Sequence, residues 1–487
     1  MKVLSKSSKF VQEYCATVVQ IGEINPIEGS DFLGMTLVNG FPIVVRKDQV
    51  KEGDVMVYCP IETQINSQFL RINNLYGMDC YELNQNRLEV DNLLNDNKRE
   101  EAKKKCGFFN KHGRVKMIRL RGQASMGYLI TLKELENYIP KLSRYNFKDH
   151  IGEDFDELCE ELFIQVYIPS VKEGTPRNSR DGRRNKKLQK ISRMIPGEFS
   201  FHYDTQQLNR SMDRFNPDTV VDISVKMHGT SICMGNVLVK KPKQFKFEFI
   251  NKLHSLLPYK LQKIEEGYDF IYSSRTVIKN DDLNPNRGSG FYSTDVWGEY
   301  GQLMKPYIPK DMEVFGEIVG FETGTNKFIQ KGYDYGCAPG TNKLMIYRIR
   351  TKNEDGTHKE WNVLEVRDWV DKLIQVFEMD HEDMVGRIVP FPLLYHGNLL
   401  NLYPNISTET HWRENVLEAL KNEKRFNMEM NEPMCLTKIP REGIVIRIHD
   451  DPVAEAFKLK CIKFLEKEAK QIDLGEIDVE MKEKEEL

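Results

Sequence analysis

The chain has 487 residues, of which 40% are hydrophobic and 29% charged, and this composition predicts a globular protein of at least two domains. No run of about 18 apolar residues occurs, and the N-terminus lacks the apolar core of a secretion signal, so we expect neither a membrane protein nor a secreted one but a cytoplasmic or nuclear protein. The net charge of −3 excludes a uniformly basic protein and leaves room for a local basic surface.

The spacing of cysteine and histidine argues against a disulfide framework and against a built-in transition-metal site. The nine cysteines are scattered singly, with no CxxC pair, and are expected to be reduced thiols. The ten histidines include no HExxH motif and no paired-ligand spacing.

Residues 1–133 predict a small β domain. Asn39-Gly40 lies between apolar runs within 35–47, which is the strongest short signal for a hairpin. A polar, helix-prone insertion covers 66–110. The other strand candidates are 16–24, 55–61, 113–122 and 127–132. A set of about five short strands favours a small β-barrel of the OB type.

Residues 134–200 predict a helical and basic linker. The segment 148–163 has the apolar spacing of an amphipathic helix. The basic stretch 172–193 suits contact with phosphates and a solvated linker equally well.

Residues 201–466 predict a larger α+β domain, and an acidic tail that is expected to be solvated follows over 467–487. Strand patterns mix with helical patterns over 361–377 and 411–424. The domain contains neither a GxGxxG loop nor a GxxxxGK[ST] loop, which excludes the usual Rossmann and Walker nucleotide sites.

Lys226 is the candidate nucleophile of this domain. It ends the apolar strand VVDISVK, and His228 and Gly229 follow it. An amine at the end of a buried strand faces a pocket, and glycine would let a ligand approach the backbone closely. Alone the pattern is weak, because a lysine near a glycine occurs by chance in any long chain.

Five later segments strengthen this interpretation because each carries a charged or aromatic residue at the end or on the face of a strand. In chain order they are SSRT with Arg275, FGE with Glu317, LMIYRI with Tyr347, EGIVIR with Glu442, and FKLK with Lys458 and Lys460. The two lysines are separated by one residue and therefore lie on one face of a strand.

Together with KMHGTS at Lys226, these segments resemble the ordered motifs I, Ia, III, IIIa, IV and V of the covalent nucleotidyltransferase superfamily, which comprises DNA ligases, RNA ligases and mRNA capping enzymes. His228 in motif I and the Lys-x-Lys form of motif V are similar to RNA ligases of the nick-sealing type. The segments 45–65 and 113–129 resemble the Deinococcus-type RNA ligase family, in which an OB domain precedes the transferase domain.

The resemblance implies a fold and a reaction. The fold is an N-terminal OB-like barrel followed by a nucleotidyltransferase (ATP-grasp-like ligase) domain of antiparallel sheets flanked by helices. The reaction is ATP-dependent RNA ligation through lysyl-AMP on Lys226, with Mg²⁺ or Mn²⁺ as the metal. Attack requires a neutral amine, and Lys458, Lys460 and the metal are expected to favour it by adding positive charge nearby.

The resemblance also implies a role for each site residue. Arg275, Lys458 and Lys460 neutralise phosphate charge, and Glu442 and Glu317 bind the metal, or Glu317 holds the ribose hydroxyls. The nucleotide contacts are Val225, Lys226, His228, Gly229, Arg275, Glu317, Tyr347, Lys458 and Lys460, with Tyr347 stacked on adenine and the Val225 backbone at its edge. Arg348 stands where the family often has aspartate.

Three residues before the domain, His202, Asp204 and Thr205, are weaker candidates for ATP contact, and a structural role is favoured for them. The insertions 236–270 and 352–440 match no motif.

The expected substrate is RNA, as a nicked duplex or as broken ends in RNA repair, with RNA/DNA hybrids as a further option. The barrel domain and the stretch 172–193 are the candidate binding surfaces. Alternatives are a DNA ligase, a GTP-dependent guanylyltransferase, or a noncatalytic nucleic-acid-binding relative. The first two are disfavoured because they need an OB domain after motif V, and 465–487 is too short for one.

Overall fold

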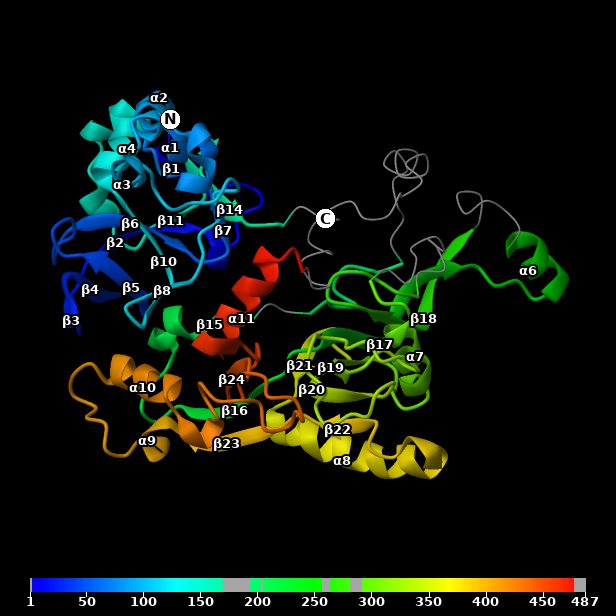
Figure 1. The fold of residues 1–487 in the computed structure, drawn as a ribbon. Helices are drawn as coiled ribbons and strands as arrows, with labels where there is room; N and C mark the ends of the chain where they lie inside the picture. Colours follow the sequence, from blue (N-terminus) through cyan, green and yellow to red (C-terminus); the bar gives the residue numbers. More distant parts are fainter. Residues whose placement is uncertain (1, 170–192, 203–204, 256–262, 281–290, 477–487) are drawn as a thin grey trace. The chain divides into compact units, whose positions relative to one another are not determined.

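The computed structural model describes residues 2–169, 193–202, 205–255, 263–280 and 291–476. The chain divides into two compact units. The first consists of Met1–Pro169 and Leu465–Asp473, and the second of Ser170–Phe464 and Leu474–Leu487. The first unit is built mainly of short strands with a helical insertion, whereas the second combines two larger sheets with helices (Figure 1). The α+β class expected from the sequence is confirmed.

The main sheet of the first unit has the strand order β10-β6-β2-β11. Its strands are β2 (Ala16–Gln20), β6 (Val55–Pro60), β10 (Gly127–Thr131) and β11 (Asp154–Phe155). Val18, Val57 and Ile130 are fully buried from one face of this sheet, and Phe69 and Leu70 of helix α1 (Ser67–Ile72) belong to the same core. The unit therefore buries its apolar surface between a strand layer and helices of the insertion.

The hairpin expected at Asn39-Gly40 is confirmed. It joins β4 (Ser30–Val38) to β5 (Phe41–Arg46), with Val38 opposite Phe41. Both turn residues have positive φ, 49° at Asn39 and 73° at Gly40, as a two-residue turn of this kind requires.

The remaining elements of the first unit are short. The insertion 66–110 is helical as expected, with η2 (Met78–Leu83), α2 (Arg87–Asn95) and α3 (Arg99–Lys104) after α1. The other elements are β1 (Leu4–Ser5), β3 (Asn25–Ile27), β7 (Thr63–Ile65), β8 (Ile118–Leu120), β9 (Gln123–Ser125), α4 (Leu132–Tyr138), β12 (Glu157–Leu158), β13 (Glu161–Leu162) and β14 (Ile164–Val166).

The prediction of an amphipathic helix over 148–163 is wrong. This segment holds the strands β11, β12 and β13, and Phe155 on β11 is completely buried. Cys159 and Glu160 both have positive φ, so they make a tight hairpin turn without the usual glycine or asparagine. Pairing of β11 with β2 and of β14 with β7 extends the first unit to Pro169, past the boundary expected at residue 133. Long-range pairing of this kind overrides local periodicity.

The start of the acidic tail is not a free solvated segment. Helix α11 spans Ile462–Asp473, and its last residue, Asp473, accepts a hydrogen bond from Nη1 of Arg114 at 2.9 Å. Arg114 is almost fully buried and also pairs with Glu62 at 2.6 Å. Residues 477–487 lie outside the described part of the chain, as does nearly all of the basic stretch 172–193.

The second unit contains two sheets. The five-stranded sheet has the order β15-β25-β24-β16-β23, and the other has the order β18-β17-β19-β20-β21 with β22 paired to β20. The strands are β15 (Gln206–Gln207), β16 (Val220–Lys226), β17 (Thr230–Pro242), β18 (Ile264–Ser273), β19 (Met312–Gly320), β20 (Asn342–Lys352), β21 (His358–Glu360), β22 (Ile388–Pro390), β23 (Leu393–Asn398), β24 (Gly443–Ile448) and β25 (Ala456–Lys460).

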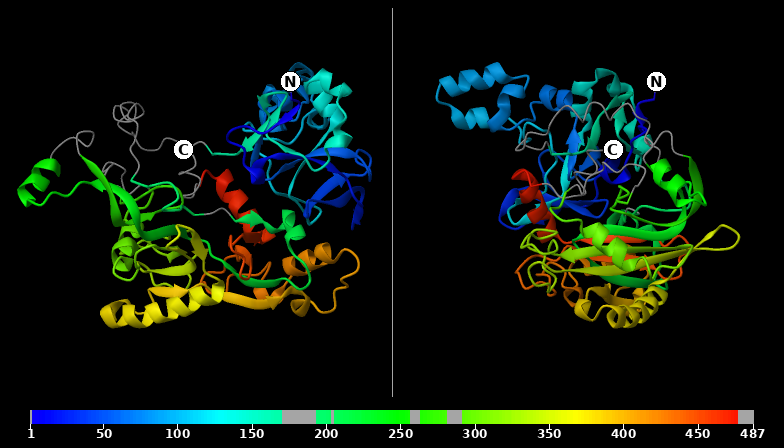
Figure 2. Two further views of the ribbon diagram at one scale, coloured as in Figure 1. Left: turned by 180° about the vertical axis from the view of Figure 1, so that it is seen from behind. Right: turned by 90° about the vertical axis from the view of Figure 1, so that its right-hand side faces the viewer.

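Helices cover the outer face of the second sheet. α8 (Val363–Asp380) runs along β20 and β22 (Figure 2). The other helices are α6 (Glu248–Ser255), α7 (Val296–Met304), α9 (Leu399–Leu402) and α10 (Trp412–Lys421). The helices expected over 361–377 and 411–424 are confirmed by α8 and α10. The side chains of Asn362 and Glu365 form a reciprocal capping box, which stabilises the start of α8.

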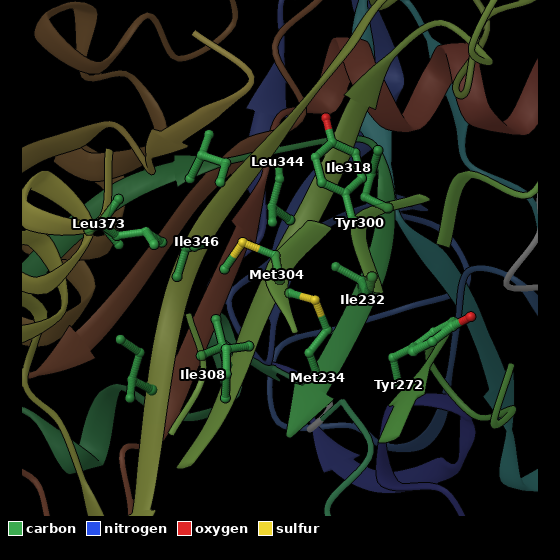
Figure 3. Close-up of a cluster of buried hydrophobic side chains, with 14 of the residues drawn as sticks. Ile232, Met234, Tyr272, Tyr300, Met304, Ile308, Ile318, Leu344, Ile346 and Leu373 are labelled. Atoms are coloured by element: carbon green, nitrogen blue, oxygen red, sulfur yellow. The ribbon is translucent and has the colours of Figure 1, made fainter. Parts of the chain in front are cut away.

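The core of the second unit lies between this sheet and its helices. Ile232, Ile318 and Leu344 point from three adjacent strands toward Tyr300 and Met304 of α7 (Figure 3). All five side chains are completely buried. Such packing makes the sheet a rigid base for groups at its strand ends.

The two unmatched insertions are parts of these sheets. Residues 236–270 extend β17 and return as β18, with α6 in between (Figure 1). Residues 352–440 supply β21, β22 and β23, and β23 pairs with the strand that carries Lys226. Within the described ranges, no helix combines the length and apolarity needed to cross a bilayer.

Candidate active site

Three paired strands bring the motif residues to one point. Lys226 ends β16 opposite Gly443 at the start of β24, and Gly443 lies opposite Lys460 at the end of β25. Adjacent strands are about 4.8 Å apart, so the side chains at these ends can meet. The sheet therefore joins residues that are far apart in sequence, as the resemblance implies.

Glu442 is the centre of this arrangement. Its Oε1 lies 2.8 Å from Nζ of Lys226 and 3.7 Å from Nζ of Lys460. Nδ1 of His228 lies 3.4 Å from Oε2. The Glu442 side chain is only 3% exposed, whereas the two lysines and the histidine are partly open to solvent. Burial alone raises the pKa of Glu442, but the charges of Lys226, His228 and Lys460 outweigh it and hold this pKa well below its usual range.

The prediction that positive groups surround the Lys226 amine is only partly correct. Lys460 is a positive neighbour, since both amines face the same carboxylate oxygen. The nearest charged atom to the amine, however, is negative. In this state the amine is bound to Glu442, and it has to leave this carboxylate before it can act as a nucleophile.

Gly443 and Gly229 are required by close packing of the chain itself. A Cβ on Gly443, whose φ is +154°, would lie 2.1 Å from the carbonyl oxygen of Leu459. A Cβ on Gly229 would lie 2.3 Å from the carbonyl oxygen of Ile318. The space at Gly229 is therefore taken by β19 and not by a ligand, which corrects the role expected for this glycine.

Glu317 holds the turn after Lys226. Its Oε1 accepts a hydrogen bond from the N–H of Gly229 at 3.1 Å, and its Oε2 accepts one from the Ser231 hydroxyl at 3.2 Å. These contacts position the motif I turn against β19.

His228 is oriented by groups that sequence patterns did not indicate. The backbone N–H of His228 donates to the Tyr335 hydroxyl at 2.8 Å. The imidazole ring packs edge-on against Tyr333 and Phe464, with ring centroids 4.8 and 5.0 Å away. Gln330 donates to the carbonyl of Gly229 at 2.9 Å. The only local signal for this support is the pair of tyrosines in the segment YDYG.

Tyr347 belongs to a neighbouring polar network on β20. Its hydroxyl lies 2.8 Å from Nδ1 of His202, and its carbonyl accepts a hydrogen bond from Nη1 of Arg447 at 3.0 Å. Burial, reinforced by the negative charge of Glu317, raises the pKa of Tyr347 well above its usual value. Arg348, the departure from the family pattern, forms a buried ion pair with Glu360 of β21 and has a structural role. Asp204 lies outside the described residues.

The remaining site residues lie on or next to strands of the two sheets. Arg275 is half-buried in the turn that follows β18, and Lys458 is 8% exposed on β25, opposite Val445 of β24. The N–H of Val225 donates to the carbonyl of Pro392, so this group is already used.

A buried ion pair fixes the backbone directly before Glu442. Nε and Nη2 of Arg441 each donate to the Glu432 carboxylate at 2.9 Å, and both side chains are at most 2% exposed. Nη1 of Arg441 also donates to the carbonyl of Phe426 at 2.6 Å.

We expect Arg441→Met to lower the free energy of unfolding by about 3–5 kcal/mol, because it leaves the Glu432 carboxylate buried without its partner. Denaturant titration measures the change. Adding Glu432→Leu to this variant is expected to restore most of the loss, and Arg46→Met, at an exposed pair with Asp48, is the control. Equal losses in the two single variants would contradict the structural role of Arg441.

Comparison with known proteins identifies the fold. Residues 15–76 match a family model described as an OB-fold domain. An apo structure of a Naegleria gruberi RNA ligase variant is similar over 94% of this chain and 99% of its own, with a TM-score of 0.50 and 16% identity. A second variant of that ligase, with ATP and Mn, is similar over 93% and 98%, with the same score and identity. This chain has the fold of these RNA ligases. No curated protein sequence matches it.

In this RNA-ligase fold the buried carboxylate of Glu442 fits a divalent metal ion. Its Oε2 is completely buried, and Nδ1 of His228, at 3.4 Å, is too distant to make a good hydrogen bond to it. A buried carboxylate oxygen without a donor is costly unless a ligand completes it, and such oxygens are what Mg²⁺ and Mn²⁺ prefer. The Glu317 oxygens, in contrast, accept hydrogen bonds from the chain. Glu442 is thus the better of the two expected metal ligands.

The lowered pKa of Glu442 predicts a specific dependence of stability on pH. A carboxyl with a lower pKa in the folded state stabilises the fold above its unfolded pKa of about 4.3 and loses this contribution as the pH falls through the folded pKa. We expect Glu442→Gln to flatten the fall of Tm below about pH 4.3.

Glu313→Gln is the matched control for this measurement. Glu313 is equally buried and pairs with Arg350, but burial raises its pKa. Its carboxyl therefore adds stability at low pH and loses it as the pH rises, so this variant should steepen the same Tm curve. The same change in both variants would contradict the assignment.

Proposed function

We propose that this chain is an ATP-dependent RNA ligase that joins 3′-hydroxyl and 5′-phosphate ends through a lysyl-AMP intermediate on Lys226. One observation carries the proposal: Lys226, Glu442 and Lys460 meet at the ends of three paired strands, in a chain with the RNA-ligase fold. A nucleophile, a buried carboxylate and a second cation at one point suit the transfer of a phosphoryl group.

In the first step the Lys226 amine attacks the α-phosphorus of ATP, an N–P bond forms and pyrophosphate leaves. Because Lys226 is paired to Glu442 at 2.8 Å, the pair separates and Nζ loses its proton before attack. Glu442 would hold a divalent cation, which would supply positive charge to the phosphate oxygens. Lys460 and Lys458 remain on the same strand face to neutralise the charge that develops.

The next two steps use the same groups. AMP moves from Lys226 to a 5′-phosphate end, which breaks the N–P bond and forms a pyrophosphate linkage. A 3′-hydroxyl then attacks this activated phosphate, and AMP leaves. Each transfer gathers negative charge on nonbridging oxygens, so the cations of Lys458, Lys460 and Arg275 serve all three steps.

Tyr347 is proposed to stack on adenine. We expect Tyr347→Ala to raise the KM for ATP about 10- to 100-fold, because loss of a stacking partner costs about 1–3 kcal/mol per base. Initial rates of adenylylation at varied ATP concentration measure it. Tyr347→Phe keeps the ring but loses the hydroxyl contact with His202, and it should retain most of the affinity. Equal losses in the two variants would place the effect on that hydrogen bond.

RNA is the proposed substrate, as a nicked duplex or as broken ends in RNA repair. OB-folds bind nucleic acid through stacking and groove electrostatics, and the first unit offers such groups. Phe32 on β4 is 70% exposed, and the N–H of the exposed Lys47 donates to its carbonyl at 2.9 Å. An exposed ring beside a cation suits a base and its phosphate.

Intact-protein mass spectrometry after incubation with ATP, GTP or NAD and Mg²⁺ tests the proposal. We expect one AMP adduct, formed with ATP. An adduct with GTP alone would instead indicate a guanylyltransferase, and RNA binding without any adduct would indicate a noncatalytic relative. Nicked duplexes in which the 3′-hydroxyl strand is either RNA or DNA then distinguish an RNA ligase from a DNA ligase. Sealing of only the nick with the DNA strand would contradict RNA as the substrate.

A further inference from the structure

A second cluster of ligand-type side chains lies outside the candidate active site. Asp222 on β16, His396 on β23 and His449 just after β24 each present one ligand atom, and these atoms lie within 4.8 Å of one another. Nδ1 of His396 is 2.8 Å from Oδ1 of Asp222, and Nδ1 of His449 is 2.7 Å from Oδ2. The two imidazole rings meet at an angle of 70°, with centroids 4.7 Å apart.

Strand pairing fixes this cluster. Asp222 lies directly opposite His396 on one side and opposite Arg447 on the other. His449 follows Arg447 by two residues, and its N–H donates to the carbonyl of Val220 at 2.9 Å. All three ligand-type residues therefore project from one face of the sheet, held by backbone hydrogen bonds and not by loops.

The environment combines a buried anion with an accessible side. The Asp222 side chain is 2% exposed, His449 14% and His396 38%. A metal ion could reach the cluster from the side of His396 while the carboxylate remains shielded from water, which strengthens its attraction for a cation. Arg447, which lies opposite Asp222 on β24, is a positive neighbour of the cluster, and its Nη1 donates to the carbonyl of Tyr347.

At His449 an outer carboxylate favours metal binding through Nδ1. Nε2 of His449 lies 3.7 Å from Oδ1 of Asp450, and Asp450 is in turn held by Asn362 at 2.8 Å. A carboxylate beyond the far nitrogen favours the tautomer with its proton on Nε2, which leaves Nδ1 free to bind a metal. This arrangement of carboxylate, histidine and metal is common around zinc.

We propose that Asp222, His396 and His449 form a binding site for a divalent transition-metal ion, with Zn²⁺ as the best-suited ion. Two imidazoles and one carboxylate are a ligand set for Zn²⁺, and they leave a fourth position for water. Tetrahedral Zn²⁺ places its ligand atoms about 3.3 Å apart. Here the three ligand atoms lie within 4.8 Å of one another, and the two nitrogens contact different oxygens of Asp222, so side-chain rotations have to bring them onto one ion. For Nδ1 to bind the metal, the proton that each neutral ring shares with Asp222 moves to Nε2 by exchange with water, so no net proton is gained or lost.

The ion would tie together β23, β16 and β24. β16 carries Lys226 at its end, so the site would stiffen the strand that presents the proposed nucleophile. Histidine spacing did not predict this site, because its ligands come from three strands that are far apart in the sequence.

Binding of Co²⁺, a spectroscopic substitute for Zn²⁺, to the full chain tests the proposal. After removal of metals with EDTA, we expect one equivalent to give the intense visible absorption of tetrahedral Co²⁺ with nitrogen and oxygen ligands. Zn²⁺ should displace it and raise Tm. The double variant His396→Ala/His449→Ala should show neither effect, and His396→Ala alone, at the exposed edge, should weaken binding at least about tenfold.

Two controls make the result decisive. Glu442→Gln should keep the Co²⁺ absorption, which separates this site from the metal of the proposed ligase reaction. His150→Ala removes a similarly exposed histidine, which pairs with Glu153 in the first unit. This variant should also keep the Co²⁺ absorption. The proposal is overturned if the wild-type protein lacks the Co²⁺ absorption. It is also overturned if the double variant binds Co²⁺ as tightly as the wild type. Formation of the AMP adduct is scored separately, so failure here is distinct from failure of the proposed function.

Discussion

Lys226→Ala is expected to abolish the AMP adduct completely and, with it, ligation of an RNA nick. The variant removes the only atom proposed to form the N–P bond, so no other group can substitute for it at a lower rate. Intact mass after incubation with ATP and Mg²⁺ measures the adduct, and peptide mapping locates it. The loss should exceed any single loss from the cations around it, because those lower a barrier while Lys226 forms the bond.

A matched control separates this effect from general loss of positive charge. Lys372→Ala removes an exposed lysine on α8 that pairs with Asp368, and it should leave the adduct unchanged. The pre-adenylylated substrate provides a second control. Lys226→Ala should still seal RNA that already carries AMP on its 5′-phosphate, since the last step needs no lysyl-AMP. An adduct that persists in Lys226→Ala, for example on Lys460, would refute the assignment of the nucleophile.

Glu442→Gln is expected to slow adenylylation about 10²- to 10³-fold at saturating ATP, the usual cost of removing one group that stabilises transition-state charge. The amide cannot hold a divalent cation as a carboxylate does, and it leaves the ammonium groups of Lys226 and Lys460 without their buried counter-charge. Single-turnover rates with Mg²⁺ and with Mn²⁺ measure the effect.

Glu313→Gln distinguishes catalysis from folding in this experiment. Both carboxylates are 3% exposed and both are paired with cations, but Glu313 pairs with Arg350 elsewhere in the second sheet. We expect both variants to lose stability and only Glu442→Gln to lose the rate. If the two variants lose the rate equally at a temperature well below their Tm, then Glu442 acts through the fold and not on the metal.

Local chemistry explains which predictions from the sequence succeeded. The hairpin at Asn39-Gly40 was predictable because asparagine and glycine adopt the positive φ angles of a two-residue turn at low cost. The helix α8 was predictable because apolar residues recur with helical spacing over 361–377. The meeting of Lys226, Glu442 and Lys460 was predictable only through the resemblance, since nothing local relates residues so far apart in the chain.

The incorrect predictions share one physical cause, which is pairing between distant segments. The segment 148–163 has helical spacing, yet β2 pairs with Asp154–Phe155 and β1 pairs with Glu157–Leu158 within it. Gly229 looked like an opening for a ligand, but the carbonyl of Ile318 fills that space. The proposed metal cluster gave no signal in the sequence for the same reason, since strand pairing with β16 brings His396 and His449 to Asp222.

The sequence by itself determined the residue types, their order along the chain and the strand ends that carry them, because propensity and spacing act over a few residues. Only the tertiary structure decided the partners: that the amine of Lys226 faces a buried carboxylate, that Glu317 holds the turn behind it, and that Asp222 lies between two histidines. Contacts across strands depend on register, and register is set by the packing of the whole sheet and not by any one segment.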